Sequence, residues 1–308
     1  MRELLLPPVD LYEEIYRLVR QIPRGKVSTP RALSEALGDA KAVRAVMETI
    51  ETAEQSRSLP VHRVVSKEGK PLCVSLTPEV CLELLRREEV EVIDGSVTPL
   101  EEYLFRDFET SSPLKRLQEL QKRLAEEVAL KDDSSKILEV VAGVDVAYRG
   151  RHGFGVCVVM DRHLRILDEA EAEMEVCFPY VSTYLTFREA PIILKTLGKV
   201  DRPFDALMIN GHGVAHPRSC GIATHIGLIL GEKPTIGVAT RRLYSRGKQG
   251  ESPYGDQITK IQRAHHGTIY VSPGNNITLE RSLETAKAFL GEHRLPEPLW
   301  RAHVKARN

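Results

Sequence analysis

The sequence of 308 residues lacks a charge excess, a long hydrophobic run and a targeting signal. Lysine plus arginine balances aspartate plus glutamate, 43 against 43, so bulk charge makes no case for nucleic-acid binding and local patches must supply one. No apolar run approaches the roughly 20 residues that span a bilayer. The N-terminus has no basic-then-apolar signal-peptide pattern. We therefore expect no membrane partner.

Cysteine is scarce, and no two cysteines have Cys-x-x-Cys spacing. The odd number of five favours buried thiols in a reducing compartment, at positions 73, 81, 157, 177 and 220. We accordingly expect a cytoplasmic protein.

The composition is that of an ordinary globular protein, with 42% hydrophobic and 28% charged residues, and the length allows two domains. Residues 88–94 form an acidic stretch that is followed by Gly95 and Pro99, which is typical of a domain's tail and a linker. We expect a first domain at residues 1–104 and a second at residues 105–308.

The first domain carries helical patterns separated by turn signals. Residues 11–20 have helical apolar spacing, and residues 22–27 break it. Ser28, Thr29 and Pro30 then indicate a helix start, with a helix at residues 31–37 that ends at Gly38. A second short helix follows from residue 40 to about residue 52. Two short helices joined by a glycine turn suit a helix-turn-helix, although many such pairs never contact DNA.

Three motifs make this domain more specific. They are Ile22-Pro-Arg-Gly-Lys-Val-Ser-Thr29, Arg44-Ala-Val46 and Pro60-Val-His-Arg-Val-Val65. Together they resemble the DNA-binding domain of alkylguanine-DNA alkyltransferases, which is winged-helix-like. In that family a cysteine in the last motif accepts the alkyl group. Val61 stands there in this sequence, and a methyl group cannot be a nucleophile, so alkyl transfer is excluded.

The pattern is closer to the alkyltransferase-like proteins, which bind alkylated bases without repairing them. The resemblance implies that Arg44 enters the duplex in place of a flipped base, and Ser28 and Arg31 are further predicted DNA contacts. The family's tyrosine after Ser-Thr is Pro30 here, which weakens the case for nucleotide flipping by this domain. We expect structural roles for His62 and Arg63.

The second domain begins with an amphipathic helix at residues 113–130. Three strands at residues 137–148, 154–160 and 165–176 are expected next. Helices at 185–197 and 221–230 then alternate with strands at 206–209 and 234–238. A meander that continues into α/β units is the architecture of ribonuclease H-like nucleases, so we expect a mixed-sheet α/β domain of that kind. Asp145, Glu189 and Asn210 fall where those nucleases place metal ligands.

The loop after the strand at 206–209 concentrates special residues. Gly211 and Gly213 permit tight turns and close approach, and Asn210, His212 and His216 crowd the strand's end. Because ligands in open α/β sheets bind beside the carboxyl ends of strands, we expect chemistry at this loop. The alternative is an ordinary strand-to-helix connection with a capping asparagine.

Residues 105–295 resemble endonuclease V, a family that nicks DNA or RNA near deaminated purines such as hypoxanthine. The resemblance rests on dense motifs in the family's order: Val141-Ala-Gly-Val-Asp145, Phe178-Pro-Tyr180, Phe187-Arg-Glu-Ala-Pro191, the glycine loop from Gly211 to Arg218, Gly221-Ile-Ala-x-His225-x-Gly227, Ile236-Gly-Val-Ala239 and Val271-Ser-Pro-Gly274.

The resemblance implies that Asp145, Glu189 and position 210 are catalytic and hold Mg²⁺ or Mn²⁺. The family's second aspartate is Asn210 here, its lysine is Thr240 and a histidine expected after Gly274 is Asn275. We therefore expect a weakened metal site that can stand unoccupied. Residues considered as local replacements are Asp205, His212, Arg241 and Arg242.

The residues that resemble lesion-reading groups are intact. Tyr180 matches the wedge that fills the gap left by the base, against the alternative of a core aromatic. The predicted pocket for the flipped base comprises Leu185, Gly211, His212, Gly213, His216 and Gly221, with His212 in place of a more usual glutamine. The best basic patch, suited to phosphate contacts, comprises Arg241, Arg242, Arg246 and Lys248. Its alternative is a solvated basic loop.

These patterns predict a DNA-repair protein that binds alkylated and deaminated bases, with weak or no nicking. It would mark lesions on DNA, or on RNA, for other repair proteins, and would associate with the nucleoid when bound to DNA. The alternative is an active endonuclease V that uses Asn210 as a neutral ligand. A third hypothesis, a scaffold that binds no lesion, predicts that Tyr180→Ala leaves DNA binding unchanged.

Overall fold

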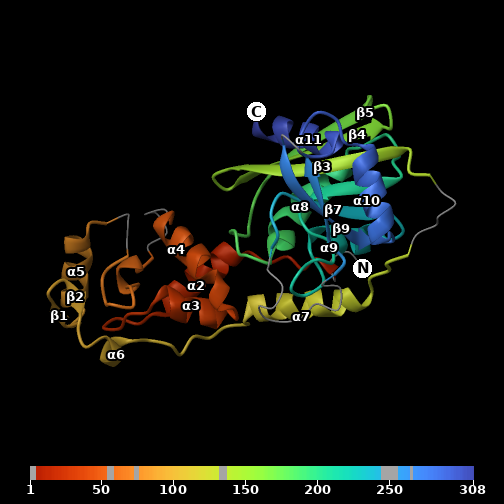
Figure 1. Cartoon of the computed structure of the whole chain (residues 1–308). Coiled ribbons are helices and arrows are strands. Elements are labelled where there is room, and N and C mark those ends of the chain that lie inside the picture. The colour runs from red at the N-terminus through yellow and green to blue at the C-terminus, as the bar shows by residue number, and fades with distance from the viewer. Residues whose placement is uncertain (1–4, 54–58, 73–75, 132–136, 244–255, 264–265) are drawn as a thin grey trace. The chain divides into compact units, whose positions relative to one another are not determined.

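The computed structural model describes residues 5–53, 59–72, 76–131, 137–243, 256–263 and 266–308. The chain divides into two compact units. One comprises residues 9–117 with 177–182, and the other comprises 1–8, 118–176 and 183–308. Figure 1 shows the elements of both along the chain. The predicted boundary after residue 104 stays a prediction.

The first unit has the expected pair of short helices. Helix α2 (Leu11–Gln21) begins where the Asp10 side chain accepts a hydrogen bond from Glu13 N. Helix α3 (Pro30–Leu37) is capped by Thr29 and ends at Gly38, whose φ of 99° is left-handed. The short turn η1 (Ala40–Ala42) leads into α4 (Val43–Glu51). The helix-turn-helix prediction is confirmed in its elements.

The remainder of this unit packs around a small apolar core. Its elements are η3 (Val61–Arg63), α5 (Pro78–Arg87), the hairpin of β1 (Val92–Ile93) and β2 (Ser96–Val97), and α6 (Leu100–Tyr103). Core side chains come from Val27, Val65, Leu85, Val90 and Val97. Glu88, at the end of α5, accepts hydrogen bonds from Arg63 and contacts His62. The structural roles expected for these two residues are confirmed.

The second unit is built on a seven-stranded mixed sheet in the order β5-β4-β3-β6-β7-β9-β8. Its strands are β3 (Val140–Arg149), β4 (His152–Asp161), β5 (Ile166–Glu175), β6 (Ala206–Asn210), β7 (Thr235–Ala239), β8 (Thr259–Arg263) and β9 (Gly267–Asn275). Strands β3, β6 and β7 run parallel, and the other neighbours pair antiparallel. The parallel centre places the ends of β6 and β7 at one edge.

Helices cover both faces of the sheet. Helices α8 (Leu185–Leu197) and α9 (Ile222–Leu230) share an apolar core with one face. Helices α10 (Leu279–Ala288) and α11 (Glu297–Arg307) share another core with the opposite face. Figure 1 shows α11 beside β3 and β4, against which it packs. Helix α7 (Pro113–Glu126) precedes the sheet and buries Leu114, Leu117, Leu120 and Leu124 on its apolar face.

The structure confirms the α/β class and the predicted strands up to β7, but the sequence patterns did not predict β8, β9, α10 or α11. It also corrects the cysteine interpretation. Cys157 and Cys220 are buried thiols, whereas Cys177 is exposed and Cys81 is disulfide-bonded. Within the described residues, no helix is both long and apolar enough to cross a membrane.

Candidate active site and lesion-binding residues

Asp145 and Asn210 meet at the centre of the sheet. The β3–β6 register pairs Val144 with Ile209, so the next residue on each strand lies at the same level. The amide nitrogen of Asn210 donates a hydrogen bond to Oδ1 of Asp145 at 3.0 Å. Asp145 is only 7% exposed, so this bond replaces water that the carboxylate gave up on folding. The structure thus brings two of the three predicted catalytic residues together.

A residue that sequence reasoning missed completes this contact. Nδ1 of His303, on α11, lies 2.6 Å from Oδ2 of Asp145. Helix α11 can approach β3 closely because residue 143 is glycine: a Cβ there would overlap the backbone of Pro298 and Leu299. Both oxygens of Asp145 are therefore held by nitrogen donors of the protein.

The missed helix did leave a signal in the sequence. Leu299, Ala302 and Ala306 are buried at helical spacing, after a start marked by Pro296 and Pro298. The motif resemblance ended at residue 295, before this pattern begins. No periodicity distinguishes His303 as a site residue, because its role depends on the packing of α11 onto β3.

Glu189 is the third predicted catalytic residue and lies buried on α8. Burial, and then the negative charge of Asp145, raise the pKa of Glu189 to about 8. The carboxyl group therefore favours its protonated, neutral form at neutral pH. Two carboxyl groups share one dry region, which is a common arrangement at functional sites.

The side chains fit a divalent cation poorly as they stand. Among the described residues, no group of three histidine, cysteine, aspartate or glutamate side chains could hold a metal ion. Mg²⁺ and Mn²⁺ prefer hard oxygen ligands, but Asn210 presents its amide nitrogen to Asp145. The Asn210–Asp145–His303 network occupies the carboxylate without a cation.

Two expectations about neighbouring residues are wrong. Asn275 pairs with Thr235 at the start of β7, about 10 Å along the strand from the level of Asn210. It is buried, and its side-chain oxygen accepts a hydrogen bond from Ala129 N at 2.9 Å, so it ties the chain after α7 to the sheet. Asp205 accepts hydrogen bonds from two backbone N–H groups at the start of β3 and cannot replace a ligand at position 210. Thr240 does follow β7 at the edge where Asn210 lies.

The glycines of the predicted base pocket are explained by packing within the protein. A Cβ at Gly211 would overlap Ile222, with Leu185 also in contact. A Cβ at Gly213 would overlap the carbonyl of Pro273, and one at Gly221 would overlap the carbonyl of His212. At these three glycines, the space that a side chain would need is filled by other parts of the protein. The contact of these residues with a flipped base stays a prediction.

The two histidines of this loop differ in environment. Both ring nitrogens of His216 are engaged, by Thr183 O at 3.1 Å and by Arg218 N at 3.2 Å. His216 therefore holds the loop. Burial lowers the pKa of His212 to about 4, so its ring is neutral, and its buried Nε2 has no hydrogen-bond partner among the described residues. Of the two, His212 has a polar atom left for a ligand.

The predicted DNA contacts also divide. Arg31 and Arg44 are exposed and pair with glutamates one turn on, Glu35 and Glu48. Ser28 is a wrong prediction, because it is fully buried and its hydroxyl donates to Phe105 O at 2.9 Å. Arg241 and Arg242 are exposed directly after β7. Arg246 and Lys248 lie outside the described residues.

Tyr180 is half exposed, at 51%, which excludes a core aromatic.

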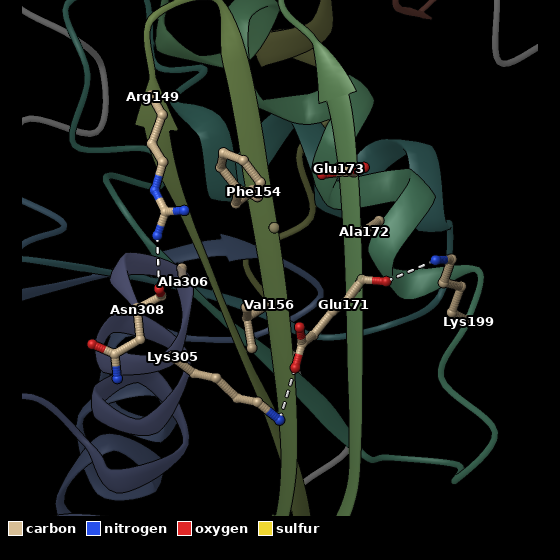
Figure 2. Close-up of a pocket in the computed structure, with 11 residues that line it drawn as sticks. Arg149, Phe154, Val156, Glu171, Ala172, Glu173, Lys199, Lys305, Ala306 and Asn308 are labelled. Carbon is tan, nitrogen blue, oxygen red and sulfur yellow. Dashed lines mark hydrogen bonds and ion pairs between the residues drawn. The ribbon is translucent and has the colours of Figure 1, made fainter.

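A separate cavity of about 270 Å³ lies between β3, β4, β5 and the end of α11 (Figure 2). Its charged walls are already paired: Lys305 contacts Glu171, and Arg149 donates to the carbonyl of Asn308. No predicted site residue lines this cavity.

The domain has a mixed sheet between two layers of helices. Buried carboxyl groups lie on its first strand and on the helix that follows the meander. Together these features define a ribonuclease H-like nuclease domain. A family model described as Endonuclease V matches residues 122–304, so it also includes His303. A second model, described as the DNA-binding domain of 6-O-methylguanine DNA methyltransferase, matches residues 10–90. The chain belongs to the endonuclease V family and carries an alkyltransferase-like DNA-binding domain before it.

Relatives with both parts exist. A bifunctional methyltransferase/endonuclease of Picrophilus torridus is 36% identical over 96% of this chain and 95% of its own. A bifunctional methyltransferase-like/endonuclease of Nanoarchaeum equitans is 32% identical over 92% of this chain and 84% of its own. The crystal structure of endonuclease V from Streptomyces avermitilis is 30% identical, with a TM-score of 0.55, over 63% of this chain and 91% of that one.

Proposed function

We propose that this protein recognises damaged bases in DNA and that its endonuclease V domain binds lesions with weak or no nicking. The proposal concerns deaminated bases for the second unit and alkylated bases for the first. The observation that carries it is the engagement of both Asp145 oxygens by Asn210 and His303.

A cation site needs negative oxygens that the protein leaves open. An aspartate at position 210 would face Asp145 with a second negative charge, and a cation would relieve that repulsion. Asparagine instead donates a hydrogen bond, so the pair is stable without a cation. Loss of one charge-stabilising group at such a site costs on the order of 10²–10³ in rate. Thr240 removes a second charge from the same edge.

The first unit supports recognition in the same way. Val61 is buried and offers no nucleophile, whereas Arg31 and Arg44 are exposed on the two helices. The unit can therefore contact DNA but cannot accept an alkyl group. A protein that holds a lesion without processing it must pass it on, so we include other repair proteins among the partners.

The alternative is a working endonuclease that uses Mg²⁺ or Mn²⁺. Asp145 and Glu189 are buried near each other and His303 contacts Asp145, which favours it. An amide oxygen can also ligate a metal, although without charge. In this case Asp145→Ala would abolish metal-dependent turnover.

Binding without metal tests the proposal. We would measure the anisotropy of labelled duplexes in EDTA, one with a single hypoxanthine and one without, and of matched RNA. We expect tighter binding to the hypoxanthine duplex. Equal affinity for both duplexes would sink the proposal. Tighter binding to the RNA would change the substrate class.

A further inference from the structure

Residues 177–182 group with the helix-turn-helix unit, although the strand before them and the helix after them belong to the other unit. Leu11 N, at the start of α2, donates a hydrogen bond to Cys177 O at 2.8 Å. Phe178 and Val181 are buried, which anchors the segment on both sides of Tyr180. Tyr180 alone keeps a large exposed aromatic surface between these anchors, at 51%.

Arg44 belongs to the same unit. It lies in the first turn of α4, and its side chain is 82% exposed. Its side chain donates a hydrogen bond to Glu48. The segment that carries Tyr180 is bonded to the start of α2, and α2 packs against α4, which carries Arg44. One exposed cation and one exposed aromatic ring therefore lie on neighbouring elements of one unit.

We propose that Arg44 and Tyr180 form one composite probe that contacts a single site on a DNA duplex. This inference rests on the proposed function, which makes duplex DNA the ligand. An aromatic ring can fill the gap where a base leaves the stack, and a guanidinium can contact the flanking phosphates or bases. The match of residues 10–90 to a DNA-binding domain supports duplex DNA as the occupant. The family-like wedge is thus presented by the helix-turn-helix unit.

A double-mutant cycle tests this on the full chain. We would measure binding of the natural protein, Arg44→Ala, Tyr180→Ala and the double variant to the hypoxanthine duplex and to the undamaged duplex. If both side chains contact the same gap in the duplex, each single change should weaken binding about tenfold. The double variant should then lose much less than the roughly hundredfold affinity expected for independent contacts. Tyr180→Phe keeps the ring and should retain most of the binding.

Arg31→Ala is the matched control, because Arg31 is an exposed arginine on the neighbouring helix with the same type of glutamate pair. Its effect should multiply with that of Tyr180→Ala. If the Arg44 and Tyr180 effects also multiply on both duplexes, the composite probe is overturned. If the natural protein binds both duplexes equally, the proposed function fails while the cycle still decides the probe. If it binds neither, both fall. Thermal melting of each variant confirms that it is folded.

Discussion

Two carboxylates, the partly buried Glu88 in the first unit and the buried Asp145 in the second, each contact a histidine but have different other partners. Glu88 receives hydrogen bonds from the cationic Arg63 and lies 3.1 Å from His62. Burial opposes its ionisation, but these partners hold its pKa at about 2. Asp145 has a neutral amide and His303 as partners, and a second carboxyl group, Glu189, nearby. At the first site the carboxylate is neutralised by a cation of the protein. The second site keeps two carboxyl groups close together, an arrangement found at active sites.

Under the proposed function, the two units lose catalysis in different ways. In the first unit, Val61 occupies the position of the nucleophile. The next two residues, His62 and Arg63, are bound to Glu88. In the second, one amide in place of a carboxylate changes what Asp145 contacts. Restoring activity should therefore need little change in the second unit. In the first it would need a new nucleophile.

The largest expected effect comes from Asn210→Asp. This change replaces the donor to Asp145 with a second negative oxygen, so Mn²⁺ binding should tighten at least tenfold. Nicking of a hypoxanthine duplex should rise on the order of 10²-fold. Calorimetric Mn²⁺ titration and single-turnover cleavage measure the two effects. Unchanged Mn²⁺ affinity would mean that Asn210 is not the residue that prevents cation binding.

Gly213→Ala should destabilise the second unit by about 3 kcal/mol, because the new Cβ overlaps the Pro273 carbonyl. Gly150→Ala is the control, since its Cβ meets nothing within 4 Å and only its φ of 61° opposes the change. We expect about 1 kcal/mol there. Denaturant unfolding gives both values. Equal costs would show that the loop is not tightly packed.

Glu88→Gln should lower the stability of the first unit by about 2 kcal/mol, since the partly buried Arg63 guanidinium loses its counter-charge. The pKa of Glu88 is depressed on folding, so its contribution is present above the ordinary carboxyl pKa and is lost as pH falls through about 2. The gap between natural protein and variant should therefore shrink between about pH 4 and pH 2. A gap that is constant with pH would exclude the ion pair as its cause.

The smallest effect is expected for Arg31→Ala. Loss of one phosphate contact should weaken DNA binding a few-fold and reduce the salt slope by about 0.9. Ser28→Ala should leave that slope unchanged, because the Ser28 hydroxyl is buried against Phe105 O. Binding titrations at several salt concentrations separate the two variants. Equal slopes for the natural protein and Arg31→Ala would remove Arg31 from the interface.

The sequence predicted elements whose signals are local. Pro30 and Gly38 bracket α3, and the apolar run from Ala206 ends at Asn210 as expected. Prediction from the sequence failed where a residue's decisive contact is with a residue far away in the chain. Ser28 looked like a DNA contact from its motif, but the chain after α6 covers it. His303 reaches Asp145 only through the packing of α11 on β3.

Asn275 illustrates the same limit of prediction from the sequence. Its motif suggested a lost catalytic group, but the β7–β9 register places it away from Asn210. Register depends on pairing between strands far apart in sequence, and a motif does not contain it. The network of Asp145, Asn210 and His303 was therefore only partly predictable.

The most direct test of the central claim is single-turnover cleavage by the natural protein. Excess protein would be incubated with Mn²⁺ and a labelled duplex that carries one hypoxanthine, with binding measured in parallel. We predict specific binding without a nicked product. Mn²⁺-dependent nicking that is abolished by Asp145→Ala would contradict the claim and show that an amide suffices at position 210.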